Sequence, residues 1–228
     1  MKLGVIIPTR GDRPALLAHA LTLLGRQTRE PDELFVIDDK PSGPGIDTGK
    51  RIRSGLKRSL DSGMDHVAIW EDDDWYRQEY LQFVADHAQG FGLFGFNTTW
   101  YFHLKTHQIW ESVHPEHTSA HAMTLTPEPF LSSFPWPEEG KEPKGMDGRL
   151  TRWANSGNTT TQYEDVKDSP PFVISMKHHG EGLWAGGGHR PAWPHWQENS
   201  QGLGWLRDRI PDSDEFEFYK SLHKDAAV

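Results

Sequence analysis

Four consecutive carboxylates, Glu71 to Asp74, are the residues of this sequence best suited to chemistry. They follow directly on the short apolar stretch 66–70, which has the composition of a buried strand. Adjacent acids repel one another, and burying one without a partner costs free energy, so we expect a cation beside them. Hard oxygen ligands suit Mg²⁺ or Mn²⁺, and such a metal would hold a phosphorylated ligand at the end of the strand. The alternative is a solvent-exposed acidic turn before a helix that begins near Arg77.

The elements before the acids alternate between strand and helix. Strands are predicted over 3–7 and 34–37, and helices over 14–25 and around Ile52, Leu56 and Leu60, whose spacing places them on one face. Together with 66–70, this alternation predicts a parallel sheet with right-handed crossovers, whose carboxyl strand ends line one crevice. The first strand ends in Pro8-Thr9-Arg10 and the second in Asp38-Asp39. We therefore expect these residues to meet the acids in a nucleotide-binding crevice.

The turns after these strands carry neither a Rossmann G-x-G-x-x-G nor a P-loop motif. The phosphates of a nucleotide must therefore be bound by a metal and by basic side chains. The second predicted helix supplies five of them between residues 50 and 58. Arg51 and Lys57 are our candidates for contacts with a phosphate or an acceptor. The alternative is a solvent-exposed basic face, although such a cluster is notable on a chain of net charge −9.

The second half of the sequence has a different character, with short aromatic strands and a hairpin over 100–110. A loop over 134–145 leads into Asp147, which could cap or begin a helix, and Gly186 to Gly188 form a second loop that we expect to be mobile. Two helices are predicted at the end of the chain. We therefore predict an α/β fold over residues 1–228 in one domain, with a mostly parallel nucleotide-binding half (1–98) and a mixed, antiparallel acceptor half (99–228).

The composition excludes several classes of function. The 228 residues contain no Cys, so thiol catalysis and a disulfide framework are ruled out. The net charge of −9 disfavours a general polyanion binder. No apolar run has the length of a membrane span, and the first residues lead into a strand rather than a signal peptide. We expect a cytoplasmic protein, which means the host cytoplasm if a phage encodes it.

Three of these motifs together resemble the GT-A fold glycosyltransferases of family 2. The motifs are Val5-Ile6-Ile7-Pro8-Thr9-Arg10, the strand end Val36-Ile37-Asp38-Asp39, and the strand that ends in Glu71-Asp72-Asp73-Asp74. They occur in the family's order and cover the first hundred residues. The resemblance implies a GT-A nucleotide-binding sheet and a nucleotide-diphosphate sugar as donor, with a UDP-sugar the expected one.

The resemblance also implies roles for the residues at the first two strand ends. Pro8, Thr9 and Arg10 would contact the nucleotide, and Asp39, together with Asp38, its base or ribose.

The metal motif follows from the third strand. Asp72 and Asp74 fill the family's Asp-x-Asp pattern and would bind Mn²⁺ or Mg²⁺. The residues at 71 and 73 form a pair of the same spacing, so the register stays open, and Asp72 and Asp73 are also counted among the nucleotide-sugar ligands.

The catalytic group implied by the resemblance is Asp147, an acid at the start of a helix behind a loop. The family usually has Glu-Asp there, whereas Met146 precedes Asp147 in this sequence. His179 or His189 resembles the histidine that some members use as a further metal ligand.

The chemistry supports the same interpretation. Sugar transfer needs a Lewis acid for the departing diphosphate and a carboxylate that takes the proton of the acceptor hydroxyl. We therefore predict a metal-dependent, inverting glycosyltransferase that acts on a hydroxyl of a soluble acceptor. The acceptors considered are a carbohydrate and, in a phage-type enzyme, hydroxymethylated bases of DNA. A nucleotidyltransferase and a non-catalytic sugar- or nucleotide-binding module are the alternatives from other classes.

Overall fold

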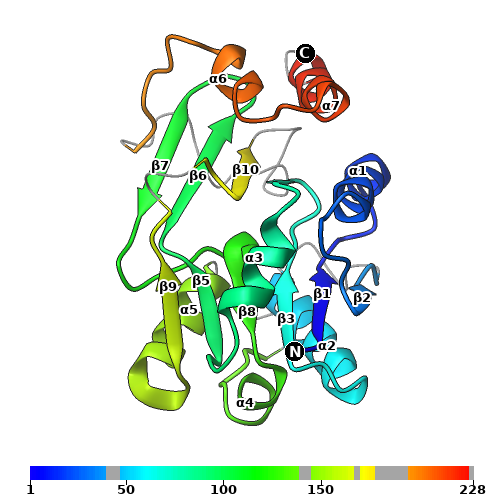
Figure 1. The fold of residues 1–228 in the computed structure, drawn as a ribbon, viewed down its shortest axis with the longest axis vertical. Coiled ribbons are helices and arrows are strands. Elements are labelled where there is room, and N and C mark those ends of the chain that lie inside the picture. Colours follow the sequence, from blue (N-terminus) through cyan, green and yellow to red (C-terminus); the bar gives the residue numbers. More distant parts are fainter. Residues whose placement is uncertain (40–46, 139–144, 167–169, 178–194, 226–228) are drawn as a thin grey trace.

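A computed structural model describes residues 1–39, 47–138, 145–166, 170–177 and 195–225 (Figure 1). The strands are β1 Leu3–Ile7, β2 Glu33–Val36, β3 His66–Ile69, β4 Trp75–Tyr76, β5 Leu93–Phe96, β6 Thr98–His103, β7 Ile109–Val113, β8 Met123–Leu125, β9 Thr161–Glu164 and β10 Val173–Lys177. The helices are α1 Pro14–Gly25, α2 Thr48–Asp61, α3 Tyr80–His87, α4 Pro127–Ser132, α5 Met146–Trp153, α6 Leu203–Arg207 and α7 Ser213–Asp225. A 3-10 turn, η1, covers Ala120–Ala122, and a π-helical turn, η2, covers Ala154–Asn158.

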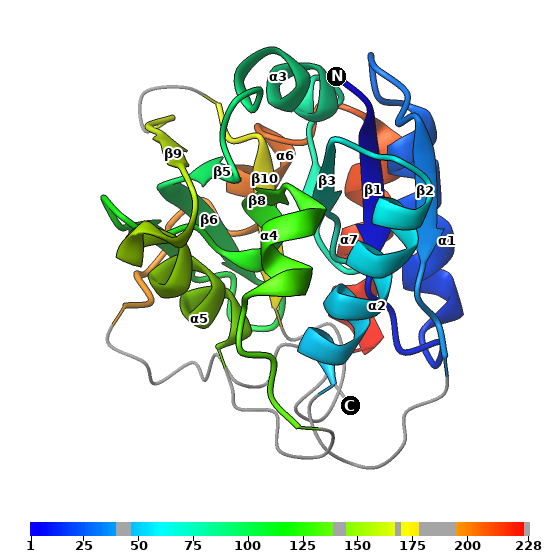
Figure 2. The ribbon, with the colours of Figure 1, turned by 90° about the horizontal axis from the view of Figure 1, so that it is seen from below.

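The larger sheet has six strands in the order β2-β1-β3-β8-β5-β9, which runs from right to left in Figure 2. The strands β2, β1 and β3 are parallel, as the alternation in the sequence predicts, and β8 inserts antiparallel between β3 and β5. All five residues of β1 are buried, because helices cover both faces of the sheet. The first half of the predicted fold is therefore confirmed.

Two apolar cores hold these layers together. The side chains of Leu3, Val5 and Ile7 join α1, α3 and α7 on one face of the sheet. The side chain of Ile6 points to the other face, where α2, α4 and α5 pack. Successive side chains of β1 thus point to opposite faces of the sheet, and helices cover both faces. A shift by one residue would exchange the side chains between the two faces, so the packing on both sides fixes the register of the strand.

The smaller sheet has the order β4-β10-β6-β7 and lies above the larger one in Figure 1. The arrows of β1 and β3 point toward it, so the carboxyl ends of these strands face the second sheet. The predicted hairpin is present as β6 and β7, which pair antiparallel. The two sheets therefore meet where the sequence places its acids.

Two strands were not predicted from the sequence. One of them, β4, has only two residues and pairs with β10, while β9 is a half-buried edge strand parallel to β5. Neither has the run of apolar residues by which a strand is recognised. Within the described ranges, none of the helices has the length and apolar character that crossing a membrane requires.

Candidate functional site

Asp72 and Asp73, which follow β3, are held by groups that follow β1. The hydroxyl of Thr9 donates a hydrogen bond to Asp72 Oδ2. The guanidinium of Arg13 binds Asp72 Oδ1 and also Asp73 Oδ2, the latter at 3.1 Å. Burial alone would lower the pKa of Arg13, but the charges of Asp73 and Asp72 outweigh it and raise that pKa. The parallel pairing of β1 with β3 thus brings the two predicted motifs into direct contact.

Asp74 faces the second sheet instead. In the antiparallel pairing of β4 with β10, Trp75 lies opposite Ile174, so the same register puts Asp74 beside Ser175. The Ser175 hydroxyl donates to Asp74 at 3.0 Å, and the backbone N–H of Met176 donates to Asp74 Oδ1 at 2.9 Å. The ammonium of Lys177 lies 3.8 Å from the same oxygen. A completely buried carboxylate is thereby supplied with donors from one strand.

His121 reaches the acids from η1, the turn that leads into β8. Val67 of β3 pairs with Leu125 of β8 in the antiparallel direction, so η1 lies near the end of β3, where the acids follow. The buried imidazole has its Nδ1 3.4 Å from Asp74 Oδ2. Ligand atoms of Glu71, Asp74 and His121 all lie within 4.8 Å of one another, which is a geometry able to hold a metal ion.

The charges of the cluster are only partly balanced. Burial raises the pKa of Asp74 to about 7, although Lys177 acts in the opposite direction. Burial and the neighbouring charge of Asp74 raise the pKa of Glu71 well above its usual value. The pKa of Lys177, which burial would lower, is raised by Asp74, Asp73 and Glu71. Four carboxylates thus share the cations of Arg13 and Lys177, and the formal charge that remains suits a divalent metal.

The donor set is also the right kind for such a metal. Two carboxylates and one imidazole suit Mn²⁺, and Mg²⁺ accepts the carboxylates. Glu71 and Asp74 come from the predicted acidic run, whereas His121 was not predicted. Asp72, predicted as a metal ligand, turns instead toward Thr9 and Arg13. The other predicted metal ligands, His179 and His189, and the Gly186–Gly188 loop lie outside the described residues.

Arg51 is near the predicted crevice but is turned inward. Its side chain is 4% exposed, and its guanidinium donates to the carbonyl oxygens of Thr9, Ile37 and Asp39 and to Asp47 Oδ2. It therefore ties the ends of β1 and β2 to the start of α2. The contacts of Arg51 in this structure join parts of the protein to one another. A direct contact between Arg51 and a nucleotide stays a prediction.

Four of the other residues predicted to contact the nucleotide sugar, which follow β1 and β2, are more exposed than Arg51. Asp38 and Asp39 are exposed just after β2, and Pro8 and Arg10 are partly exposed after β1. Gly11 (φ +74°) lets these two strand ends approach, because a Cβ there would lie only 2.8 Å from the Asp38 carbonyl oxygen.

Lys57 lies further along α2 than Arg51. Its side chain is exposed and paired with Asp61, which is on the same helix. A contact between Lys57 and the ligand is therefore left as a prediction.

Asp147 lies in the first turn of α5, as predicted. Gly145 is the N-cap residue, and no side-chain hydrogen bond caps this helix, so Asp147 is not an N-cap. Its Oδ2 lies 3.8 Å from Nε2 of His117, and both side chains are 29% exposed. The charge of Asp147 is among the causes that raise the pKa of Glu71, so the carboxylate acts electrostatically on the acidic cluster.

Sequence reasoning missed four contributors to the site: Arg13, His121, Ser175 and Lys177. Arg13 directly precedes α1. Ser175 and Lys177 lie in β10, and His121 lies in the turn before β8; both strands pair with segments that are distant in sequence. One available signal was the strand Val173–Lys177, in which polar Ser175 and Lys177 alternate with apolar residues.

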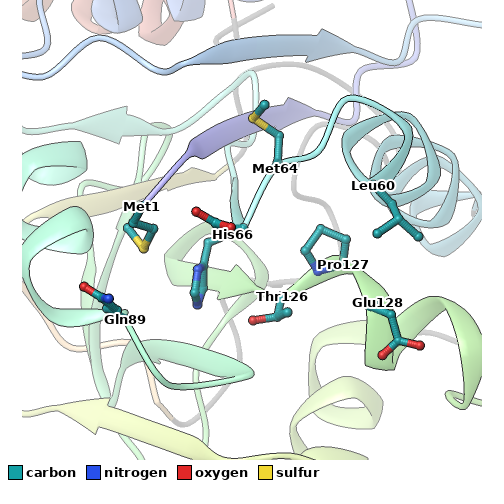
Figure 3. Close-up of a pocket in the computed structure, with 9 residues that line it drawn as sticks. Met1, Leu60, Met64, His66, Gln89, Thr126, Pro127 and Glu128 are labelled. Atoms are coloured by element: carbon teal, nitrogen blue, oxygen red, sulfur yellow. The ribbon is translucent and has the colours of Figure 1, made fainter.

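Two pockets lie away from the acidic cluster. One, of about 490 Å³, lies at the opposite ends of β1 and β3, where Met1, His66, Thr126 and Glu128 surround it (Figure 3). The other, of about 970 Å³, is lined by residues that include Trp100 and Arg209 and extends to the end of α1. Ligands of open α/β sheets bind at the carboxyl ends of the strands, so the first pocket is at the wrong edge for the nucleotide site.

Comparison with solved structures relates the fold to that of S. aureus TarS. No family model matches the sequence, and the search of curated proteins gave no match. The structure of S. aureus TarS 1–349 in complex with UDP-GlcNAc has a TM-score of 0.54 and 13% identity over 99% of this chain and 72% of that one. The structure of TarS 1–349 in complex with UDP has a TM-score of 0.50 and 13% identity over 78% and 62%.

A longer TarS structure has a TM-score of 0.53 and 15% identity, over 78% of this chain and 37% of that one. This chain therefore matches little more than a third of that protein's length. At these identities the likeness concerns the fold, and it confirms the GT-A type of fold that the sequence predicts.

Proposed function

We propose that this protein is a metal-dependent, inverting glycosyltransferase that moves a sugar from a nucleotide-diphosphate sugar to an acceptor hydroxyl. One observation carries the proposal: Glu71, Asp74 and His121 converge at the carboxyl ends of the strands, next to the end of β1. The fold is that of TarS, one of whose structures contains UDP-GlcNAc. A UDP-sugar is accordingly the first donor to test.

The donor would lie across the strand ends. The exposed carboxylates of Asp38 and Asp39 are suited to the base and ribose hydroxyls, while Pro8, Thr9 and Arg10 follow the neighbouring strand β1 and would contact the nucleotide. Glu71, Asp74 and His121 would hold the divalent metal, with Asp72 ordering the crevice through Thr9 and Arg13. When bound, Mn²⁺ or Mg²⁺ supplies Lewis-acid stabilisation to the diphosphate leaving group.

Asp147 is the group proposed to receive the acceptor proton. It is partly exposed, and its charge is among the causes that raise the pKa of Glu71, which supports a position within electrostatic reach of the acidic cluster. In a single displacement, the acceptor oxygen forms its bond to the anomeric carbon while the bond to the diphosphate breaks and the proton moves to the carboxylate. Attack from the face opposite the leaving group inverts the anomeric centre.

A carbohydrate is the acceptor that the surface favours. Tyr101 stacks on Trp110 with ring centroids 4.6 Å apart, and Trp110 stacks on the exposed His195 at 5.1 Å. Aromatic side chains suit the faces of sugars, and the exposed side of this group is the place proposed for the acceptor sugar. The net charge of −9 makes DNA with hydroxymethylated bases the less favourable acceptor.

The test is product analysis with UDP-sugars and Mn²⁺. Release of UDP that stops in a chelator supports the proposal, whereas release of pyrophosphate would indicate nucleotidyl transfer. Nucleotide binding with neither transfer nor hydrolysis would identify a binding module. Glu71→Gln should abolish metal-dependent release, and Asp61→Asn, which changes an exposed acid at the far end of α2, is the matched control.

A further inference from the structure

The imidazole of His117 lies beside the carboxylate of Asp147. It follows β7 in a turn where its N–H donates to the carbonyl oxygen of His114. Gly148 of α5 lies next to the His117 ring, since a Cβ there would be in ordinary van der Waals contact with it at 3.9 Å. The contact of 3.8 Å between Nε2 and Asp147 Oδ2 is about 1 Å longer than a hydrogen bond, so a small side-chain movement closes it.

The surroundings of His117 keep its ring neutral. Burial lowers the pKa of His117, and the charges of His114 and Arg152 act in the same direction. Asp147 is the neighbour that opposes them. A neutral imidazole beside a carboxylate can accept a proton, and the negative charge stabilises the imidazolium that forms.

We propose that His117 receives the proton that Asp147 takes from the acceptor hydroxyl; this inference rests on the proposed function. The proton leaves the acceptor oxygen for Asp147 Oδ2 as the glycosidic bond forms and the bond to the diphosphate breaks. It then passes to Nε2 of His117 and from there to water, because the imidazole is partly exposed. The carboxylate of Asp147 is thereby restored for the next turnover.

The proton transfer from Asp147 to His117 is favourable because an imidazole is more basic than a carboxylate. A carboxylic acid has a pKa of about 4 and an imidazole one of about 6.5, so an imidazole binds the proton more strongly even after a moderate lowering. His117 acts through Asp147 and does not contact the reacting sugar. It is therefore a positioning and proton-accepting residue for Asp147.

The first experiment measures the pair without any catalysis. NMR titration of the His117 ring should give a lower midpoint in Asp147→Asn than in the wild type, by about 0.5 to 1 pH unit, because the stabilising charge is gone. Asp61→Asn should leave the midpoint unchanged. An unchanged midpoint in Asp147→Asn would overturn the proposed pairing.

The second experiment measures the pH dependence of transfer. In the wild type, kcat should fall as the pH drops below the pKa of His117, because the charged imidazole cannot accept a proton. In His117→Gln, kcat should fall about tenfold near neutral pH, and the acid limb should move to lower pH, where Asp147 itself titrates. The KM for the donor should not change, and His87→Gln, at an exposed position at the end of α3, should behave as the wild type.

The outcomes separate the two claims. A wild-type protein that never releases a nucleoside diphosphate refutes the proposed function and the relay that depends on it. An active wild type whose His117→Gln variant keeps its kcat and pH profile refutes the relay alone.

Discussion

The ammonium of Lys177 lies 3.8 Å from Oδ1 of Asp74, and both side chains are buried. Lys177 is the last residue of β10, whose pairing with β4 aligns the strand beside the acidic run. The amine is thus a built-in cation for carboxylates that would otherwise repel one another. It balances part of their charge and leaves the remainder for a divalent ion.

Lys177→Met should therefore have opposite effects on stability and on metal binding. In a chelator, loss of the buried cation should lower the free energy of unfolding by about 3–5 kcal/mol, because Asp74 is left without it. The rise in melting temperature produced by Mn²⁺ should be larger than in the wild type, since one competing cation has gone. Thermal unfolding with EDTA and with Mn²⁺ measures both effects. The exposed Lys57→Met is the control. An equal rise in melting temperature with Mn²⁺ in the wild type and in Lys177→Met would contradict the proposal that Lys177 and the metal share the same carboxylates.

The first half of the fold could be predicted because its signal is local. The strands 3–7, 34–37 and 66–70 are apolar runs that end in polar residues, and amphipathic helices separate them. Each run is recognised within a few residues, and the handedness of the crossovers then fixes the parallel order. The contact between Thr9 and Asp72 follows from the parallel pairing of the first and third strands.

The second half of the site could not be predicted because its signal is pairing between distant segments. The antiparallel insertion of β8 brings the preceding turn η1, with His121, near the end of β3, and β10 brings Ser175 to Asp74. The short β4 and the edge strand β9 have no apolar pattern that would reveal these partners. In the same way, the basic character of α2 did not distinguish the buried Arg51 from the exposed Lys57.

Arg51→Lys should test whether Arg51 is a structural clamp. An ammonium has three donors and cannot reproduce the contacts of the guanidinium with three carbonyl oxygens and Asp47. We expect the free energy of unfolding in urea to fall by about 2–4 kcal/mol. The exposed Arg53→Lys should change it by less than about 0.5 kcal/mol. Weaker nucleotide binding by Arg51→Lys at unchanged stability would instead favour the direct contact predicted from the sequence.

His19 should make the stability depend on pH. Its ring stacks on Phe218 of α7 at 3.7 Å, and burial lowers its pKa to about 4. Between about pH 6.5 and 4 the unfolded chain binds a proton that the folded protein does not, so stability is lost as the pH falls through this range. The loss should be on the order of 1–2 kcal/mol, allowing for solvent screening at a partly exposed ring.

His19→Phe keeps the stacking but removes the titrating group. The curve of unfolding free energy against pH should therefore be flatter in this variant, as urea denaturation at about pH 4.5 and 7 would measure. His87→Phe, at an exposed position at the end of α3, is the comparison. Parallel curves for the wild type and His19→Phe would show that His19 does not cause the dependence.

Asp147→Asn should separate the chemistry from the binding. Gly145 rather than Asp147 is the N-cap of α5, so the substitution removes only a favourable charge in the first helical turn, worth about 0.3–1 kcal/mol. Folding and metal-dependent nucleotide binding should survive, while transfer should fall by a factor on the order of 10² or more, because an amide cannot take the proton. Initial rates at saturating donor, together with the donor's binding constant, measure the two effects. Near wild-type transfer would remove Asp147 from the reaction.

NMR of the wild-type product should show an inverted anomeric centre, because the acceptor attacks from the face opposite the leaving diphosphate. A product that retains the donor's anomeric configuration would exclude the single-displacement mechanism.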